Sequence, residues 1–168
     1  WYMACNNAVI NSDDYMGAGH NYYMYFDPMN GQMNMLPWDC NEAFGVHGPS
    51  TNPWLYSVTM NSTNFNMPLV HRLLAVPEWK ELYFAHYRSI LKRWINWTNV
   101  LGPLNKKYQD LIRTDVAREP YFLFTQSQFN PSFAGRFFFN GHYVHGLKEV
   151  IQGRETFLKS RLNLRKAE

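Results

Sequence analysis

A short run of turn-forming residues between two strand-like segments constrains this chain more than any other feature. Residues 21–26 are rich in aromatic side chains, which favours a strand, and residues 32–36 alternate polar and apolar side chains. Between them, residues 27–31 have turn chemistry, because a proline fixes φ and an Asn-Gly pair tolerates positive φ. The sequence therefore predicts a β-hairpin, and its open end brings Asn21 and Asp39 together.

Acidic residues flank this predicted hairpin on both sides. Asp39 follows the return strand and precedes a Phe-Gly pair at 44–45. Asp13 and Asp14 lie in the loop that enters the hairpin. Two carboxylates and the carboxamide of Asn21 form an arrangement suited to a metal ion and a phosphate. Protein kinases use the same plan, in which a catalytic Asp, an Asn metal ligand and a metal-binding Asp before Phe-Gly follow one another along the chain.

The same residues resemble a known family. The motifs that carry the resemblance are Asn11-x-Asp13-x-Tyr15, Gly19-His20-Asn21-Tyr22-Tyr23-Met24-Tyr25 and Pro37-Trp38-Asp39-x-Asn41-Glu42-Ala43-Phe44-Gly45. They are similar to the spore-coat-protein-H (CotH) kinase family, and looser similarity continues to about Leu162. The resemblance implies an atypical protein-kinase-like fold, ATP, a divalent metal ion (Mg²⁺ or Mn²⁺) and phosphoryl transfer to Ser or Thr of a protein substrate. It also suggests a spore-coat, cell-surface or secreted location.

The length and the first residue of the chain bear on its domain organisation. The 168 residues are enough for one domain. The chain begins at Trp1 without an initiator methionine, and the family's catalytic domain is longer. We therefore expect residues 1–168 to be the C-terminal lobe of a CotH kinase-like domain, with the N-terminal lobe and its phosphate-binding lysine upstream. Such a lobe is expected to be inactive alone, because half of the nucleotide cleft would be absent.

Most of the remaining sequence predicts helix. Apolar residues at helical spacing predict helices over about 1–10, 68–76, 78–97, 103–117 and 144–164. Pro77 is expected to interrupt the helical region. Residues 46–67 and 120–143 are expected to be irregular, since Pro and Gly interrupt them. The predicted fold class is α+β, an atypical protein-kinase-like C-lobe that is mostly helical, with a short β-hairpin carrying the site.

Three residues receive functional roles. Asp13 is the predicted catalytic residue, which would orient the acceptor hydroxyl and take its proton. Asp14 is its rival, and spacing alone does not separate the two. Asn21 and Asp39 are the predicted metal ligands, because Mg²⁺ prefers carboxylate and carbonyl oxygens together with substrate phosphates. The structural alternatives are a turn-forming role for Asp13 and a helix-capping role for Asp39.

Several other side chains near these positions have structural interpretations. His20 is expected to make a structural or orienting hydrogen bond, because no HxH or HExxH spacing supports zinc. Trp38 either packs beneath the metal loop or joins the core, and Arg154 is expected to pair with an acid. Asn41 stands where many relatives have a second Asp, which would weaken a second metal contact. The two cysteines, Cys5 and Cys40, are either free or paired with each other.

The composition of the chain limits the kinds of partner that it is expected to bind. The net charge is +3 and charged residues make up only 17% of the chain, so a nucleic-acid surface is not expected. No apolar run approaches the roughly 20 residues that span a bilayer. Aromatic residues reach 17%, which we attribute mainly to a packed core. Two alternative functions remain, a catalytically silent CotH-like module for binding or coat assembly, and a metal-dependent hydrolase that uses the same acids.

Overall fold

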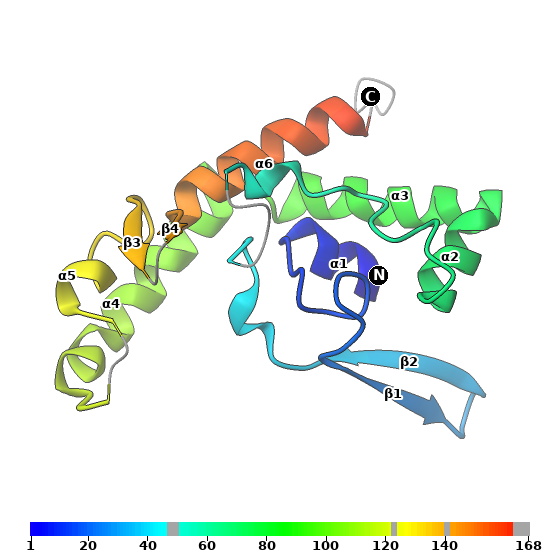
Figure 1. Cartoon of the computed structure of the whole chain (residues 1–168), viewed down its shortest axis with the longest axis horizontal. Coiled ribbons are helices and arrows are strands. Elements are labelled where there is room, and N and C mark those ends of the chain that lie inside the picture. The colour runs from blue at the N-terminus through cyan, green and yellow to red at the C-terminus, as the bar shows by residue number, and fades with distance from the viewer. Residues whose placement is uncertain (47–50, 122–123, 140–141, 163–168) are drawn as a thin grey trace.

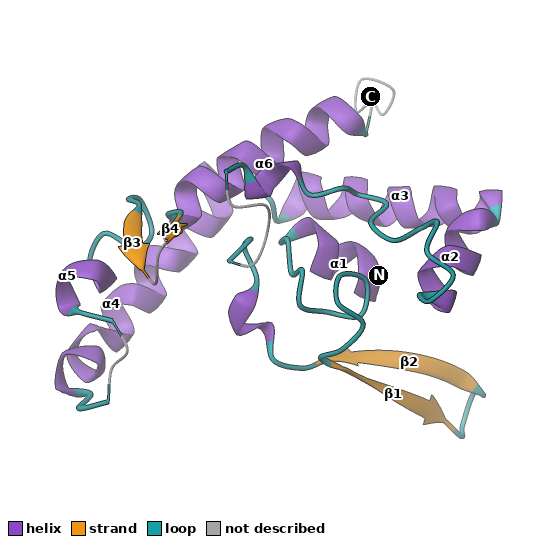
Figure 2. Ribbon diagram, viewed as in Figure 1, coloured by secondary structure: helices purple, strands orange, loops and turns teal. Residues whose placement is uncertain are grey.

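The computed structural model describes residues 1–46, 51–121, 124–139 and 142–162. Its helices are α1 (Tyr2–Ala8), α2 (Pro68–Ala75), α3 (Pro77–Arg93), α4 (Gly102–Arg118), α5 (Gln126–Phe129) and α6 (Leu147–Arg161). Its strands are β1 (Tyr22–Asp27), β2 (Gln32–Pro37), β3 (Phe137–Phe139) and β4 (His142–Val144). Short 3₁₀ turns at Cys40–Glu42 and Pro53–Leu55 and a π-helical turn at Trp97–Leu101 complete the elements (Figure 1). The fold is α+β and dominated by helix (Figure 2).

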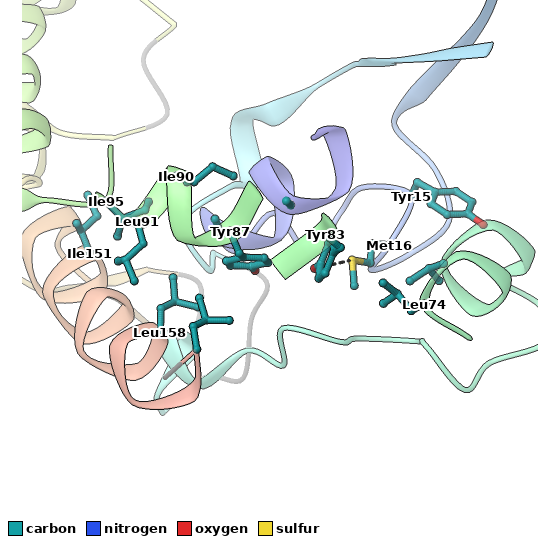
Figure 3. Close-up of a cluster of buried hydrophobic side chains, with 14 of the residues drawn as sticks. Tyr15, Met16, Leu74, Tyr83, Tyr87, Ile90, Leu91, Ile95, Ile151 and Leu158 are labelled. Carbon is teal, nitrogen blue, oxygen red and sulfur yellow. Dashed lines mark hydrogen bonds between the residues drawn. The ribbon is translucent and has the colours of Figure 1, made fainter. Parts of the chain in front are cut away.

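Helices α1, α3 and α6 form the body of the molecule. The short helix α1 lies against α3, and α6 contacts the C-terminal part of α3 (Figure 1). Ile90 and Leu91 of α3 meet Ile151 and Leu158 of α6 in the main hydrophobic cluster (Figure 3). Each fully buried aliphatic side chain of this kind contributes about 1.5–3 kcal/mol relative to an exposed one. The body therefore has a core of its own, contributed by elements that are far apart in the sequence.

Proline residues fix the boundaries of the central helices. Pro68 and Pro77 each occupy the first turn of a helix, α2 and α3 respectively, where the missing N–H would have no partner. The residue before a proline is disfavoured in helical conformation. Val76 accordingly has an extended backbone, with φ −88° and ψ 119°, and separates the two helices. The expected interruption at Pro77 is confirmed.

Strands β1 and β2 form the predicted antiparallel hairpin. The register pairs Tyr22 with Pro37 at the open end and Asp27 with Gln32 at the turn. Gly31 adopts φ 70° at the end of that turn, a conformation that glycine reaches without a steric penalty. The strand boundaries lie within one residue of those expected from the sequence, so this prediction is confirmed.

The hairpin projects from the body and touches it only at its open end (Figure 1). Tyr22 and Met35 pack against the main cluster, while most other large apolar side chains of the hairpin are exposed. The exposed set comprises Tyr23, Met24, Tyr25, Phe26, Met29, Met33 and Leu36. The expectation that aromatic residues mainly fill the core is therefore wrong for the hairpin.

The region 120–143 is more regular than the sequence suggests. It contains the short helix α5, whose N-terminus is capped by a capping box of Thr125 and Gln128, and a second antiparallel pair formed by β3 and β4. The expected single hairpin is thus wrong for the described residues, which contain two. The second hairpin has three-residue strands, and its apolar run has no alternation from which a strand could be predicted.

The remaining helix predictions are confirmed in position, and the bounds of α2 and α4 lie within one residue of those expected. The helix expected over 78–97 ends at Arg93, and a π-helical turn follows at Trp97–Leu101. The last helix begins at Leu147 rather than 144, and its expected end at 164 lies outside the described residues. Cys5 and Cys40 are both exposed and free, so they do not pair with each other. Within the described ranges, no helix has the length and apolar character needed to cross a bilayer.

Candidate functional site

The candidate site lies next to the C-terminal end of α1, where backbone hydrogen bonds join two loops. The carbonyl oxygens of Val9 and Ile10 accept hydrogen bonds from the backbone N–H groups of Phe44 (2.7 Å) and Gly45 (3.1 Å). Gly45 has φ 78°, and a Cβ at this position would lie 2.4 Å from Cβ of Pro53. A side chain at residue 45 therefore cannot be accommodated without displacing the chain. These contacts fix the loop after Asp39 to the segment that leads directly into the Asp13 loop.

Asp13, His20 and Asn21 are in direct contact. The amide nitrogen Nδ2 of Asn21 donates to Oδ2 of Asp13 at 2.7 Å. The Nε2 atom of His20 lies 3.1 Å from the other oxygen, Oδ1, of the same carboxylate. The Asp13 side chain is 24% exposed, so its carboxylate is held in place and still accessible from solvent.

Asn21 and Asp39 lie at the same, open end of the hairpin, as the sequence predicts. The backbone N–H of Trp38 donates to the carbonyl oxygen of Asn21 at 3.2 Å, which places Asp39 one residue beyond this bridge. Both residues have left-handed backbones, with φ 53° at Asn21 and φ 49° at Asp39. Asn and Asp tolerate this conformation better than other residues with a Cβ. Uncommon backbone conformations of this kind cluster at functional sites.

The carboxylate of Asp39 is exposed and does not cap the following helical turn. The 3₁₀ turn at Cys40–Glu42 starts directly after Asp39, yet its first residues receive no hydrogen bond from this side chain. The capping alternative for Asp39 is therefore wrong.

Asn41 lies in the same turn and lines a cavity of about 310 Å³ together with Phe44 and residues of the second hairpin.

Trp38 does not pack beneath the metal loop or join the core. Its side chain is exposed and makes an edge-on contact with Tyr23, with ring centroids 5.5 Å apart. Both sequence interpretations of Trp38 are therefore wrong, and the residue belongs to the exposed aromatic surface of the hairpin.

Asp14, the rival of Asp13, is buried. Its exposed fraction is 1%, and Oδ1 accepts a hydrogen bond from the N–H of Gly17 at 2.9 Å. Burial raises the pKa of the Asp14 carboxyl to about 6, although hydrogen bonds from the backbone N–H groups of Gly17 and Met16 oppose this rise. Its second oxygen, Oδ2, is also buried and has no hydrogen-bond partner. Asp14 thus caps the turn at 14–17 and does not face solvent.

Arg154 contacts the end of α1, which leads into the site, and does not pair with an acid. Its guanidinium donates to the carbonyl oxygens of Asn7 (2.8 Å), Ala8 (3.3 Å), Trp54 (3.0 Å) and Tyr56, and to the side chains of Asn7 and Tyr87. The residue is 1% exposed, and burial lowers the pKa of its guanidinium. All of these partners are neutral oxygens, so the expected pairing with an acid is wrong. The contact fixes the C-terminal end of α1, two residues before the Asp13 loop begins.

The sequence reasoning missed the residues that hold the site in place. Asn7 and Tyr87 link α1 to α3 and to Arg154 through a buried network. Ile10 has φ 56°, which is rare for a β-branched residue and turns the chain from α1 into the site. No local pattern signals these roles, because each partner comes from a distant part of the sequence.

The side chains at the hairpin base fit a hard divalent cation better than zinc. Among the residues that the structure describes, no three His, Cys, Asp or Glu side chains are grouped closely enough to hold a metal ion. Mg²⁺, however, is commonly bound by one or two protein oxygens together with water and substrate phosphates. Since Nδ2 of Asn21 donates to Asp13, its carboxamide oxygen points elsewhere. A carboxamide oxygen and a carboxylate, the donor types of Asn21 and Asp39, are among those that Mg²⁺ prefers.

The fold and this site define a helix-dominated α+β protein that presents carboxylate and carboxamide groups at the base of a projecting hairpin. The chain belongs to the CotH kinase protein family, because the sequence model of that family matches residues 1–158. The resemblance expected from the sequence motifs is thereby confirmed. No curated protein and no solved structure matches the chain.

Proposed function

We propose that this chain carries the catalytic base and the metal ligands of an atypical protein kinase that transfers the γ-phosphoryl group of ATP to a Ser or Thr hydroxyl of a protein. The observation that carries the proposal is the hydrogen bond between Asn21 and Asp13 at the base of a hairpin where Asp39 also lies. Membership of the CotH kinase family supports the same reading. A catalytic carboxylate, an Asn and an acid before Phe-Gly are the parts that kinase chemistry requires.

Asp13 is the base in this proposal. The acceptor hydroxyl oxygen forms a bond to the γ-phosphorus, the bond from that phosphorus to the β–γ bridging oxygen breaks, and ADP leaves. The hydroxyl proton passes to a carboxylate oxygen of Asp13. Asp14 is a poor candidate for this step, because its carboxylate is buried and caps a turn. Most of the catalysis is positioning and charge stabilisation, which is the usual division of work in phosphoryl transfer.

Asn21 and Asp39 would hold a Mg²⁺ or Mn²⁺ ion through the carboxamide oxygen and the carboxylate. When bound, such an ion neutralises charge on the β- and γ-phosphates of the nucleotide. The hydrogen bond from Asn21 to Asp13 ties the metal ligand to the base, so both would respond together to any movement of the hairpin.

We assign the chain to the C-terminal lobe of the kinase-like domain. The helical body with one projecting hairpin at its site supports this assignment. In this arrangement the strands that cover the nucleotide and the lysine that contacts its phosphates come from another part of the full-length protein.

The test compares Asp39→Asn with a control acid, Asp115→Asn, in the full-length protein. Asp115 lies on α4, away from the hairpin, and is exposed. We expect Asp39→Asn to reduce metal-dependent nucleotide affinity and transfer of labelled phosphate together, and Asp115→Asn to leave both unchanged. An unaltered Mg²⁺ titration of activity in Asp39→Asn would contradict the metal assignment. A wild-type protein that binds a protein partner without phosphorylating it would favour the silent binding module, and turnover without ATP would favour the hydrolase.

A further inference from the structure

His20 engages the oxygen of Asp13 that Asn21 leaves free. Asn21 donates to Oδ2 of Asp13 at 2.7 Å, and Nε2 of His20 lies 3.1 Å from Oδ1. Two consecutive residues thus hold the two oxygens of one carboxylate. Such a pair of contacts fixes the rotation of the carboxylate as well as its position.

The backbone of the loop directs both side chains at Asp13. The N–H groups of Ala18 (2.9 Å) and Gly19 (3.0 Å) donate to the carbonyl oxygen of Asp14, which closes the loop on itself. Gly19 then adopts φ 83° and Asn21 adopts φ 53° on either side of His20. These two left-handed residues return the chain to Asp13, so the contact follows from the loop conformation and not from a chance approach of a long side chain.

We propose that His20 is a positioning residue for the Asp13 carboxylate, holding Oδ1 through an Nε2–H donor while Asn21 holds Oδ2. Each carboxylate oxygen has two acceptor sites, so both oxygens keep a free site to receive the acceptor proton. The imidazole is 55% exposed and the Asp13 side chain is 24% exposed, so the carboxylate stays accessible from solvent while His20 contacts it. This inference rests on the proposed function, because it gives His20 a role in the step that Asp13 performs.

The main test is a set of substitutions at His20 in the full-length protein. His20→Ala removes the donor, whereas His20→Gln keeps an amide N–H at the position of Nε2. We expect His20→Ala to lower the transfer rate at saturating ATP roughly ten-fold, the scale of one hydrogen bond to a charged group. We expect His20→Gln to restore most of this rate, and neither variant to change the KM or Kd for ATP. His86→Gln on α3 is the matched control and should behave as wild type.

A double-mutant cycle separates positioning from a general structural role. If His20 acts only through Asp13, then adding His20→Ala to Asp13→Asn should cause no further loss of rate. Additive losses, a full rate in His20→Ala, or failure of His20→Gln to recover activity would each overturn the inference.

A measurement that does not need activity distinguishes this inference from the proposed function. The ring ¹⁵N chemical shifts of His20 report which nitrogen carries hydrogen, and we expect them to change in Asp13→Asn and to stay constant in Asp115→Asn. If the shifts respond while the wild type transfers no phosphate, the contact stands and the kinase assignment fails. If the wild type is active and the shifts do not respond, the kinase assignment stands and the role of His20 fails.

Discussion

The helical body and the β1–β2 hairpin place polar and apolar side chains in opposite environments. The body buries Arg154, Asn7 and Asp14, each at 1% exposure, among α1, α3 and α6. The hairpin leaves Phe26 57% exposed and Met33 54% exposed, although both are apolar. Arg154 and Asn7 have hydrogen-bond partners inside the body, whereas the hairpin leaves large apolar side chains exposed to solvent.

The difference separates the part of the molecule that stabilises the fold from the part that carries the proposed site. Buried polar groups that have partners lock the body into one arrangement, because leaving any of them unpaired is costly. The hairpin contributes little to the core but carries Asn21 and leads to Asp39 at its base. The candidate site lies at the junction, where Val9 and Ile10 accept hydrogen bonds from Phe44 and Gly45. Changes in the body should therefore affect stability, and changes at the junction should affect chemistry.

The largest effect is expected for Arg154→Met in the body. The substitution leaves the carbonyl oxygens of Ala8, Trp54 and Tyr56 buried without their donor. We expect the free energy of unfolding to fall by about 3–5 kcal/mol, the range for breaking a buried charged network. Urea unfolding monitored by circular dichroism measures it. Arg161→Met, on the exposed side of α6, is the control. An equal loss of unfolding free energy in the two variants would show that the buried contacts of Arg154 do not account for the effect.

The next largest effect is expected at the junction, where Asp13→Asn should lower the rate of phosphoryl transfer and leave the free energy of unfolding unchanged. We expect the transfer rate to fall roughly 10²-fold, the lower range of general-base effects, with ATP affinity nearly intact. Asp14→Asn should be mild in the same single-turnover assay, because Asp14 is buried and caps a turn. The opposite result, with Asp14→Asn inactive and Asp13→Asn active, would identify the buried Asp14 as the base.

A somewhat smaller effect concerns the pH dependence of stability. The pKa of Asp14 is raised to about 6 in the folded chain by burial, so the folded state holds this proton more tightly than the unfolded state does. Stability from this group is therefore present below about pH 4 and is lost as the pH rises through about 6. We expect the wild type to lose on the order of 2–3 kcal/mol relative to Asp14→Asn across this window. Urea midpoints of both proteins at several pH values test it, and parallel curves would show that Asp14 is not buried in solution.

The smallest effect is expected at the outer part of the hairpin. Phe26→Ser removes a large apolar side chain that is already exposed, so the free energy of unfolding should change by less than about 0.5 kcal/mol. Leu158→Ala, in a fully buried position of α6, should cost about 2–5 kcal/mol by comparison. Thermal unfolding of the two variants measures the contrast, and a large loss in Phe26→Ser would show that the hairpin packs against the body.

Local signals in the sequence were sufficient for the hairpin and for the positions of Asp13, Asn21 and Asp39. The turn at 27–31 sets the register, and the register sets which residues meet at the open end. The burial of Asp14 could not be predicted in this way, because Asp13 and Asp14 are identical and adjacent. Only the way the loop closes around Gly17, whose Cβ would lie 2.0 Å from the carbonyl oxygen of Ser12, places one inside and one outside.

The role of Arg154 shows the second limit of sequence reasoning. Its acceptors are mostly backbone carbonyl groups, which every residue has, and they belong to Asn7, Ala8, Trp54 and Tyr56, about a hundred or more positions earlier. A search for an acidic partner therefore predicts the wrong contact. Pairing with carbonyl groups depends on tertiary packing and has no counterpart in residue type or spacing.

The left-handed backbones at Asn21 and Asp39 restrict which substitutions these positions tolerate. Gly, Asn and Asp enter this conformation readily, while Glu carries the same charge as Asp but gains no comparable backbone tolerance. A saturation library selected only for folding should therefore be enriched in Gly, Asn and Asp at both positions. Under the proposed function, Asp39→Gly would remove the metal ligand and relieve the backbone at once, so it should give a folded protein without transfer activity.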